Sequence, residues 1–181
     1  LKEGRSVQEG GAVYNFTGPQ GFGIANMADG LFAIRKLVYE EKKVSMEEFK
    51  EALAWNYDKG LDAQSAGDMT EMIMKAMQKA GKEADASTAA GLLKTFIGMK
   101  PGEQKTQRFK EIHDMIDEVP KFGNDIPEID YFAREVAYTY SKPLQNYSNP
   151  RGGRFQAGLY PVSANVPLGG QTGATPDGRY A

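Results

Sequence analysis

The feature that most constrains the fold is one extended run, residues 155–166, in a chain whose other regular patterns are helical. Pro161 interrupts this run and has no amide to donate to a sheet, so we expect an edge strand or a bulge there. A buried strand needs neighbours for its backbone groups, and the sequence offers no second strand pattern. We therefore expect the partner strands to lie outside these residues.

Upstream of this run, apolar residues recur at helical spacing. Ser45 and Glu48 have the spacing of a capping box, Asp68 is expected to cap a further helix, and Pro143 should end or kink the last one. The predicted helices cover residues 24–38, 45–57, 68–77, 87–97, 109–116 and 129–140. The prediction is a mostly helical α/β chain with one late strand.

Charge and residue content exclude several classes of function. With 22 basic and 24 acidic residues the net charge is -2, which favours neither nucleic acid nor an anionic membrane surface as a partner. No apolar run approaches the roughly 18 to 20 residues that span a bilayer, and the start resembles no signal peptide, so a cytoplasmic protein is expected. The absence of cysteine and the single histidine argue against a thiolate nucleophile, a disulfide and a multi-histidine metal site.

Three local motifs have ordinary structural interpretations. The glycine-rich residues 18–23 precede a helix and could present amides to an anion, but they match neither the dinucleotide fingerprint nor a P-loop, so a tight turn is favoured. His113 lies in an apolar helical face, which favours a core or boundary position. The motif RGGRF at residues 151–155 favours a turn into the strand, with Arg154 as a candidate ligand-binding side chain.

Three blocks of sequence, in order, resemble the pyruvate formate-lyase-like glycyl radical enzymes. The first is YNFTGPQGFGIAN at residues 14–26, and the second is VPKFGND at residues 119–125. The third comprises PRGGRFQ at 150–156, LYPVSANVPLG at 159–169 and GATPDGR at 173–179. Residues 58–106 do not match the family pattern in the same way, and we interpret them as a helical insertion within a partial barrel domain that covers residues 1–181.

The resemblance implies a ten-stranded α/β barrel in which residues 155–166 form a late strand. It also implies radical chemistry, in which a C-terminal glycyl radical, installed by a separate radical-SAM iron–sulfur activating enzyme, generates a thiyl radical on a central cysteine. This chain contains no cysteine, and no glycine-radical motif is identified in it, so we expect no catalytic residue here and no activity from the chain alone. It opens without methionine and stops after the turn-rich residues 175–179, so both ends are expected to be internal.

The resemblance makes the late strand a candidate wall of the substrate pocket. Side chains alternate along a strand, so Tyr160, Val162 and Ala164 share one face, while Leu159, Pro161, Ser163 and Asn165 share the other. We favour the first set as the face toward the barrel interior, because a phenol followed by small apolar groups suits a small polar substrate. Arg154, just before the strand, has a forked guanidinium that suits a carboxylate or sulfonate.

The leading functional hypothesis is an internal segment of a glycyl radical lyase or dehydratase that cleaves a C–O, C–N, C–C or C–S bond of a small polar molecule. Its partners would be that substrate, the activating enzyme, the remainder of the barrel and further copies of the protein. A formate acetyltransferase proper is the alternative enzyme, and two adjacent cysteines in the flanking sequence would distinguish it. A non-enzymatic helical interaction module is the third hypothesis.

Overall fold

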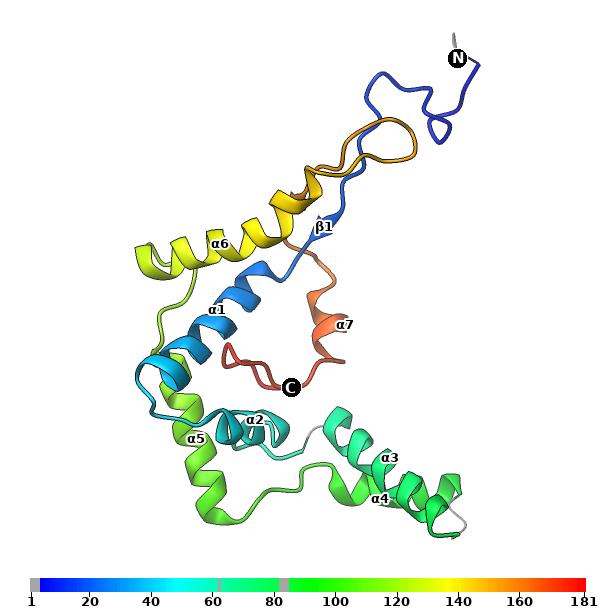
Figure 1. The fold of residues 1–181 in the computed structure, drawn as a ribbon. Helices are drawn as coiled ribbons and strands as arrows, with labels where there is room; N and C mark the ends of the chain where they lie inside the picture. The colour runs from blue at the N-terminus through cyan, green and yellow to red at the C-terminus, as the bar shows by residue number, and fades with distance from the viewer. Residues whose placement is uncertain (1–3, 62, 82–84) are drawn as a thin grey trace. The chain divides into compact units, whose positions relative to one another are not determined.

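The computed structural model describes residues 4–61, 63–81 and 85–181 (Figure 1). Residues 1–3 at the start of the chain, and residues 62 and 82–84 of the predicted insertion, lie outside the described residues. The chain divides into two compact units. One contains the residues up to Asp29 together with Lys121–Ser163, and the other contains Gly30–Pro120 with Ala164–Ala181.

The predicted helices are confirmed, with changes at their ends. Asp68 lies inside its helix and does not cap it, because the helix begins at Ala63, where Ala, Gln and Ser residues continue it upstream and Ala66 is fully buried. Pro143 lies in the last turn of its helix, where it ends the helix one residue later. The helices are α1 (Ile24–Ile34), a π-helical continuation η1 (Arg35–Glu40), α2 (Met46–Ala54), α3 (Ala63–Lys79), α4 (Ala86–Phe96), α5 (Glu103–Glu118), α6 (Pro127–Leu144) and α7 (Asn165–Gly169).

In the first unit, the start of α1 packs against α6. Ala28 of α1 is fully buried, and Ala133 and Val136 of α6 are buried against it. Ile24 and Phe132 extend the contact at its margin. Small residues at the centre allow the two helices to approach closely, so this contact holds α6 beside the segment that leads into α1 (Figure 1).

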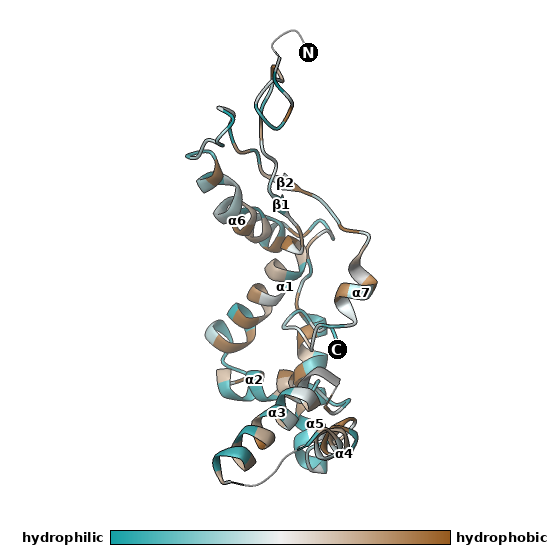
Figure 2. Cartoon of the chain, turned by 90° about the vertical axis from the view of Figure 1, so that its right-hand side faces the viewer, coloured by the Kyte–Doolittle hydropathy of each residue, from teal (hydrophilic) through white to brown (hydrophobic). Residues whose placement is uncertain are grey.

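The late strand is present but short, and it has a partner within the chain. Strand β2 (Gly158–Leu159) pairs in parallel with β1 (Gln20–Gly21), as Figure 2 shows. The expectation that every partner strand lies outside the sequence was therefore wrong, because β1 is too short to show alternation and lies in the glycine-rich loop. The predicted run to residue 166 also ends early, since α7 begins at Asn165. Pro161, which has no amide, follows the paired residues.

The second unit is built from two helix contacts, α2 against α5 and α3 against α4. The predicted capping box is confirmed: the Glu48 amide donates to the Ser45 hydroxyl at 3.1 Å, and the Ser45 amide donates to the Glu48 carboxylate at 3.0 Å. The core holds Phe49 of α2 with Ile112 and Ile116 of α5, all of them buried. Helices α3 and α4 occupy much of residues 58–106, and the interpretation of that stretch as an insertion stays a prediction.

An aromatic cluster in the second unit anchors the end of the chain. His113 is buried, as predicted, and stacks on Tyr180 at 4.3 Å between ring centroids, while Tyr57 meets His113 edge-on at 4.8 Å. The Tyr57 hydroxyl donates to the Thr175 carbonyl at 2.7 Å, and His113 Nε2 lies 2.8 Å from the Gly178 carbonyl oxygen. A carbonyl only accepts, so Nε2 donates and His113 has a structural role.

Burial and hydrogen bonding change the ionisation of this cluster. Desolvation raises the pKa of Tyr57, and the nearby Asp177 carboxylate adds to the rise. Desolvation also raises the pKa of Tyr180, helped by the hydrogen bond that its hydroxyl donates to Asp58. Both phenols therefore remain neutral donors across the ordinary pH range. Within the described part of the chain, no helix has the length and apolar character that a membrane crossing requires.

Candidate functional site

A close packing contact at Gly21 shows on which side of the strand pair the Leu159 side chain lies. A Cβ built on Gly21 would lie 2.6 and 2.9 Å from ring carbons of Tyr140 on α6, and 2.9 Å from Leu159 Cδ2. Gly21 and Leu159 are register partners in the parallel pair, so the Leu159 side chain lies over Gly21. This side of the strand pair is therefore the one covered by α6.

Tyr160 directly follows β2 and lies on the opposite side of the chain from Leu159. Its ring folds back over Gly158, where a built Cβ would lie 2.9 Å from Tyr160 Cε1. Residues two apart in an extended chain share a face, which places Gly158 and Tyr160 together and Leu159 on the other face. Tyr160 and Leu159 are each 46% exposed, so the two sides differ in the packing of Tyr140 near Leu159 and not in exposure.

Val162 and Ala164, two other predicted site residues, lie in different kinds of local structure. Val162 is half-buried and follows the paired residues in an irregular segment. Ala164 is half-buried and is the N-cap residue of α7, so it belongs to the second unit and not to the strand. The alternation that grouped Tyr160, Val162 and Ala164 therefore does not extend to Ala164, because the chain turns into a helix there.

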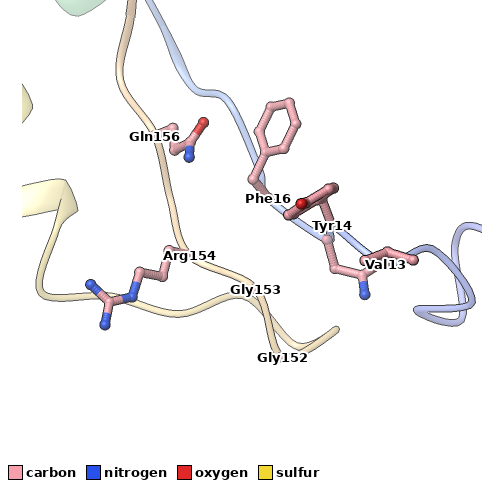
Figure 3. Close-up of a pocket in the computed structure, with 8 residues that line it drawn as sticks. Val13, Tyr14, Phe16, Gly152, Gly153, Arg154 and Gln156 are labelled. Carbon is pink, nitrogen blue, oxygen red and sulfur yellow. The ribbon is translucent and has the colours of Figure 1, made fainter.

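Arg154 is exposed and lies at the start of the segment that leads into β2. It borders an open pocket lined by the aromatic rings of Tyr14 and Phe16 and by the backbone of Gly152 and Gly153. In Figure 3 its guanidinium extends away from both aromatic rings. The predicted turn at residues 151–154 is confirmed, with Gly152 at φ +80°, and it carries the chain into the strand.

Asn149 is a residue that sequence reasoning did not select. Its side chain is only 6% exposed and joins the segment before β1 to the segment before β2. An asparagine in a loop gives no signal of such a role in a single sequence, because the partners are more than 130 positions away. The signal that was available is the tight glycine pair that follows it, Gly152 and Gly153.

The chemistry available on these residues is binding and orientation. A phenol donates or accepts a hydrogen bond, and a half-buried valine beside it excludes water from one side of a small molecule. Among the described residues, no group of three or more acidic or histidine side chains is placed to hold a metal ion.

Comparison with known proteins identifies the family. The sequence pattern described as pyruvate formate lyase-like matches residues 1–169. The chain belongs to the pyruvate formate lyase-like family. Its fold is a mostly helical part of the barrel of glycyl radical enzymes, as the sequence predicts, and the relatives are glycyl radical dehydratases and lyases.

Two solved structures and one curated relative illustrate the similarity. The chain is 58% identical, with a TM-score of 0.88, to a structure described by 1,2-propanediol dehydration in Roseburia inulinivorans, covering 99% of this chain and 22% of that one. It is 38% identical, with a TM-score of 0.66, to the glycerol-bound B12-independent glycerol dehydratase of Clostridium butyricum, covering 99% of this chain and 17% of that one. The probable dehydratase YbiW of Escherichia coli K12 is 31% identical over 100% of this chain and 17% of its own length.

The coverage of these relatives limits what is known of the whole protein. The chain spans about a fifth of their length, so most of each relative has no counterpart in these residues.

Proposed function

We propose that this chain is part of a glycyl radical dehydratase that removes water from a small vicinal diol by cleaving a C–O bond. The observation that carries the proposal is the 58% identity, over 99% of the chain, to a structure described by 1,2-propanediol dehydration. The 38% identity to a glycerol dehydratase supports the same substrate class, since both substrates carry neighbouring hydroxyl groups. Within the wider range of bonds that such lyases cleave, C–O is therefore favoured.

The proposed role of this chain is to form part of the substrate pocket. Tyr160 would bind a hydroxyl group of the diol, and Val162 would exclude water beside it. Support comes from the side of β2 on which Tyr160 lies: α6 covers the Leu159 side, and in an α/β barrel helices cover the outside of the strands. The Tyr160 side then corresponds to the interior. Ala164, in the turn that begins α7, is proposed only as a small residue that leaves space.

Arg154 has a role in this proposal only for a charged substrate. A neutral diol offers no partner for a forked guanidinium, whereas a carboxylate or sulfonate does. In Figure 3 the Arg154 side chain points away from the rings of Tyr14 and Phe16. We therefore assign Arg154 to the alternative in which the substrate is an anion.

The radical machinery belongs to other parts of the full-length protein. The glycyl radical, installed by a separate activating enzyme, would supply hydrogen abstraction when present. This chain, which has no cysteine, fits the binding role and not the relay. Holding a substrate in a water-excluded pocket accounts for a large share of such catalysis, because reacting groups must stay aligned.

The test uses the full-length protein with its activating enzyme, under anaerobic conditions and at matched radical content. We expect aldehyde formation from 1,2-propanediol or glycerol. Release of sulfite from isethionate, or formation of formate and acetyl-CoA from pyruvate, would instead replace the diol assignment by C–S cleavage or by formate acetyltransferase activity.

Replacing Tyr160 by phenylalanine tests the pocket itself. Losing one hydrogen bond to the substrate should lower turnover by roughly five- to 150-fold, which corresponds to about 1 to 3 kcal/mol, while the melting temperature changes little. Tyr131→Phe, on the exposed side of α6 at 60% exposure, is the matched control and should leave turnover unchanged. Wild-type turnover in Tyr160→Phe would contradict the assignment of this face.

A further inference from the structure

Asn149 is the centre of a hydrogen-bonded group of polar residues outside the proposed pocket. We call this group, Asn149 with Asn15, Thr17, Arg151 and Gly153, the Asn149 node. Asn149 is 6% exposed and follows α6 by five residues. Its side-chain Nδ2 donates to the Asn15 carbonyl and, at 3.0 Å, to the Thr17 hydroxyl. Its Oδ1 accepts from the amides of Arg151 at 2.9 Å and Gly153 at 3.0 Å. The side-chain amide of Asn149 thus uses all of its hydrogen-bonding positions. They reach two separate segments, residues 15–17 and residues 151–153.

The two segments are in direct contact at this point. A Cβ built on Gly153 would lie 1.8 Å from the Asn15 carbonyl oxygen, so only glycine permits the approach. Arg151 adds a second connection, since its guanidinium donates to the Phe16 carbonyl and to the Thr17 hydroxyl, each at 3.2 Å. The node therefore fixes residues 15–17 against residues 149–153.

From this node the same two segments run on as the parallel pair. Thr17 bridges Phe155, then Gln20 pairs with Gly158 and Gly21 with Leu159, and one register is kept throughout. Between them, the Gln156 amide donates to the Thr17 carbonyl at 2.9 Å and the Gly158 amide to the Pro19 carbonyl at 3.0 Å. A regular pair of only two residues a side has few contacts of its own to hold its register, so the node at its start adds side-chain restraint to these backbone hydrogen bonds.

Register decides on which side of the strand pair Leu159 and the next residue, Tyr160, lie. Side chains alternate, so a slip of one residue moves Leu159 off Gly21 and exchanges the sides of Leu159 and Tyr160. In the observed register Leu159 lies over Gly21, and Tyr160 lies on the opposite face. The restraint at the start of the pair thus controls the direction of the Tyr160 phenol.

We propose that Asn149 is a positioning residue: it sets the register of β1 and β2 and thereby aims Tyr160 at the substrate. The register part rests on this chain alone, whereas the consequence for turnover rests on the proposed function. Asn149 would touch no substrate atom, because its amide group is fully used by Asn15, Thr17, Arg151 and Gly153. It would act only through the strand pair.

The test compares three forms of the full-length protein: wild type, Asn149→Asp and Asn146→Asp. Asn149→Asp keeps the shape but replaces both donors of Nδ2 with an acceptor that faces the Asn15 carbonyl. Asn146→Asp is the matched control, because Asn146 lies on the same loop and is exposed. Asn149→Ser, which is small and retains one donor, guards against a general failure of the aspartate to fold.

The first measurement is amide hydrogen exchange, which needs no activity. Exchange at Gln156 and Gly158, whose amides donate across the pair, should be at least tenfold faster in Asn149→Asp and Asn149→Ser than in wild type and in Asn146→Asp. Amides of α5, in the other unit, should exchange at the wild-type rate, which separates a local change from global unfolding. Unchanged exchange at Gln156 and Gly158 would overturn the proposal, whatever the enzyme's activity.

The second measurement is a double-mutant cycle on turnover with Tyr160→Phe. If Asn149 acts through Tyr160, Asn149→Asp should lower kcat by about 10- to 100-fold, and adding Tyr160→Phe should cost little more. Independent, multiplicative losses would overturn the link to Tyr160. If the wild-type protein dehydrates no diol, the proposed function fails, while the exchange experiment still decides the register.

Discussion

Gly21 offers the sharpest test of how β1 and β2 pack against α6. In Gly21→Ala the new methyl group would meet Tyr140 ring carbons at 2.6 and 2.9 Å and Leu159 Cδ2 at 2.9 Å. Ordinary contacts between carbon atoms are about 3.5 to 4.0 Å, so the ring or the strand has to move by roughly 1 Å. Overpacking of this kind costs about 1 to 3 kcal/mol. The contact joins one residue of each strand to α6, so the cost should fall on the pair itself.

The same loop provides a control. Gly18 has ordinary space around it, since a built Cβ would lie 3.7 Å from Phe16 Cε2 and 3.8 Å from the Gln156 carbonyl oxygen. Gly18→Ala should therefore be neutral or slightly stabilising, by up to about 1 kcal/mol, because alanine restricts the unfolded chain. The two variants differ only in which glycine of the loop gains the methyl group.

The assay is amide exchange at Gly158 in the full-length protein. A local loss of about 1 to 3 kcal/mol corresponds to roughly five- to 150-fold faster exchange in Gly21→Ala, with no acceleration in Gly18→Ala. Tyr140→Ala in the Gly21→Ala background should recover part of the protection, because it removes the closest obstacle. Equal exchange in the two glycine variants would refute the packing that places Leu159 toward α6 and Tyr160 away from it.

Three predictions concern the second unit. Ser45→Ala should destabilise the start of α2 by about 1 kcal/mol, measured by local amide exchange. The pKa of Glu48 is lowered, chiefly by the hydrogen bond that its carboxylate accepts from the Ser45 amide. The ionised carboxylate therefore stabilises the folded state above about pH 4.3, and this stabilisation is lost as the pH falls further. The difference between wild type and Glu48→Gln, below about 1 kcal/mol at a half-exposed site, should shrink as the pH falls below about 4.3. Tyr57→Phe should cost about 1 kcal/mol and speed exchange at Gly178, because the Thr175 carbonyl loses one of its two donors and keeps only the Gly178 amide.

Local patterns were sufficient to predict the helices. Apolar spacing and the Ser45 capping box located the start of α2 to within a residue, because these signals lie within one or two turns of the chain, whereas the helix ends at Ala54, three residues before the predicted end. The prediction that Asp68 caps its helix was wrong. An aspartate three residues before a glutamate has the spacing of a cap, but Ala66, which precedes it, is already buried within the helix. The residues from Ala63 to Ala66 continue the helix upstream, so the polar residue at position 68 lies within it.

The strand pair shows where local reasoning ends. The partner of β2 is Gln20–Gly21, which lies in a loop of glycine and proline residues and carries no alternation. Parallel pairing joins residues far apart in the sequence, so no short-range pattern in either segment can reveal it. The prediction that Tyr160, Val162 and Ala164 share a face rests on alternation, which holds only where the backbone stays extended, and the start of α7 excludes Ala164 from it.

The same limit explains why Asn149 and Gly21 were missed although both control the candidate site. Each acts through contacts with distant segments: Asn149 with Asn15 and Thr17, and Gly21 with Tyr140 and Leu159. Asparagine and glycine are common in loops, so their residue types give no signal. Gly21 matters because there is no space for a side chain, and Asn149 because its side-chain amide is fully hydrogen-bonded. If the Tyr160 phenol binds substrate, these two contacts set its direction through the short strand pair that precedes it. Mutations at either position should then alter turnover without touching the pocket.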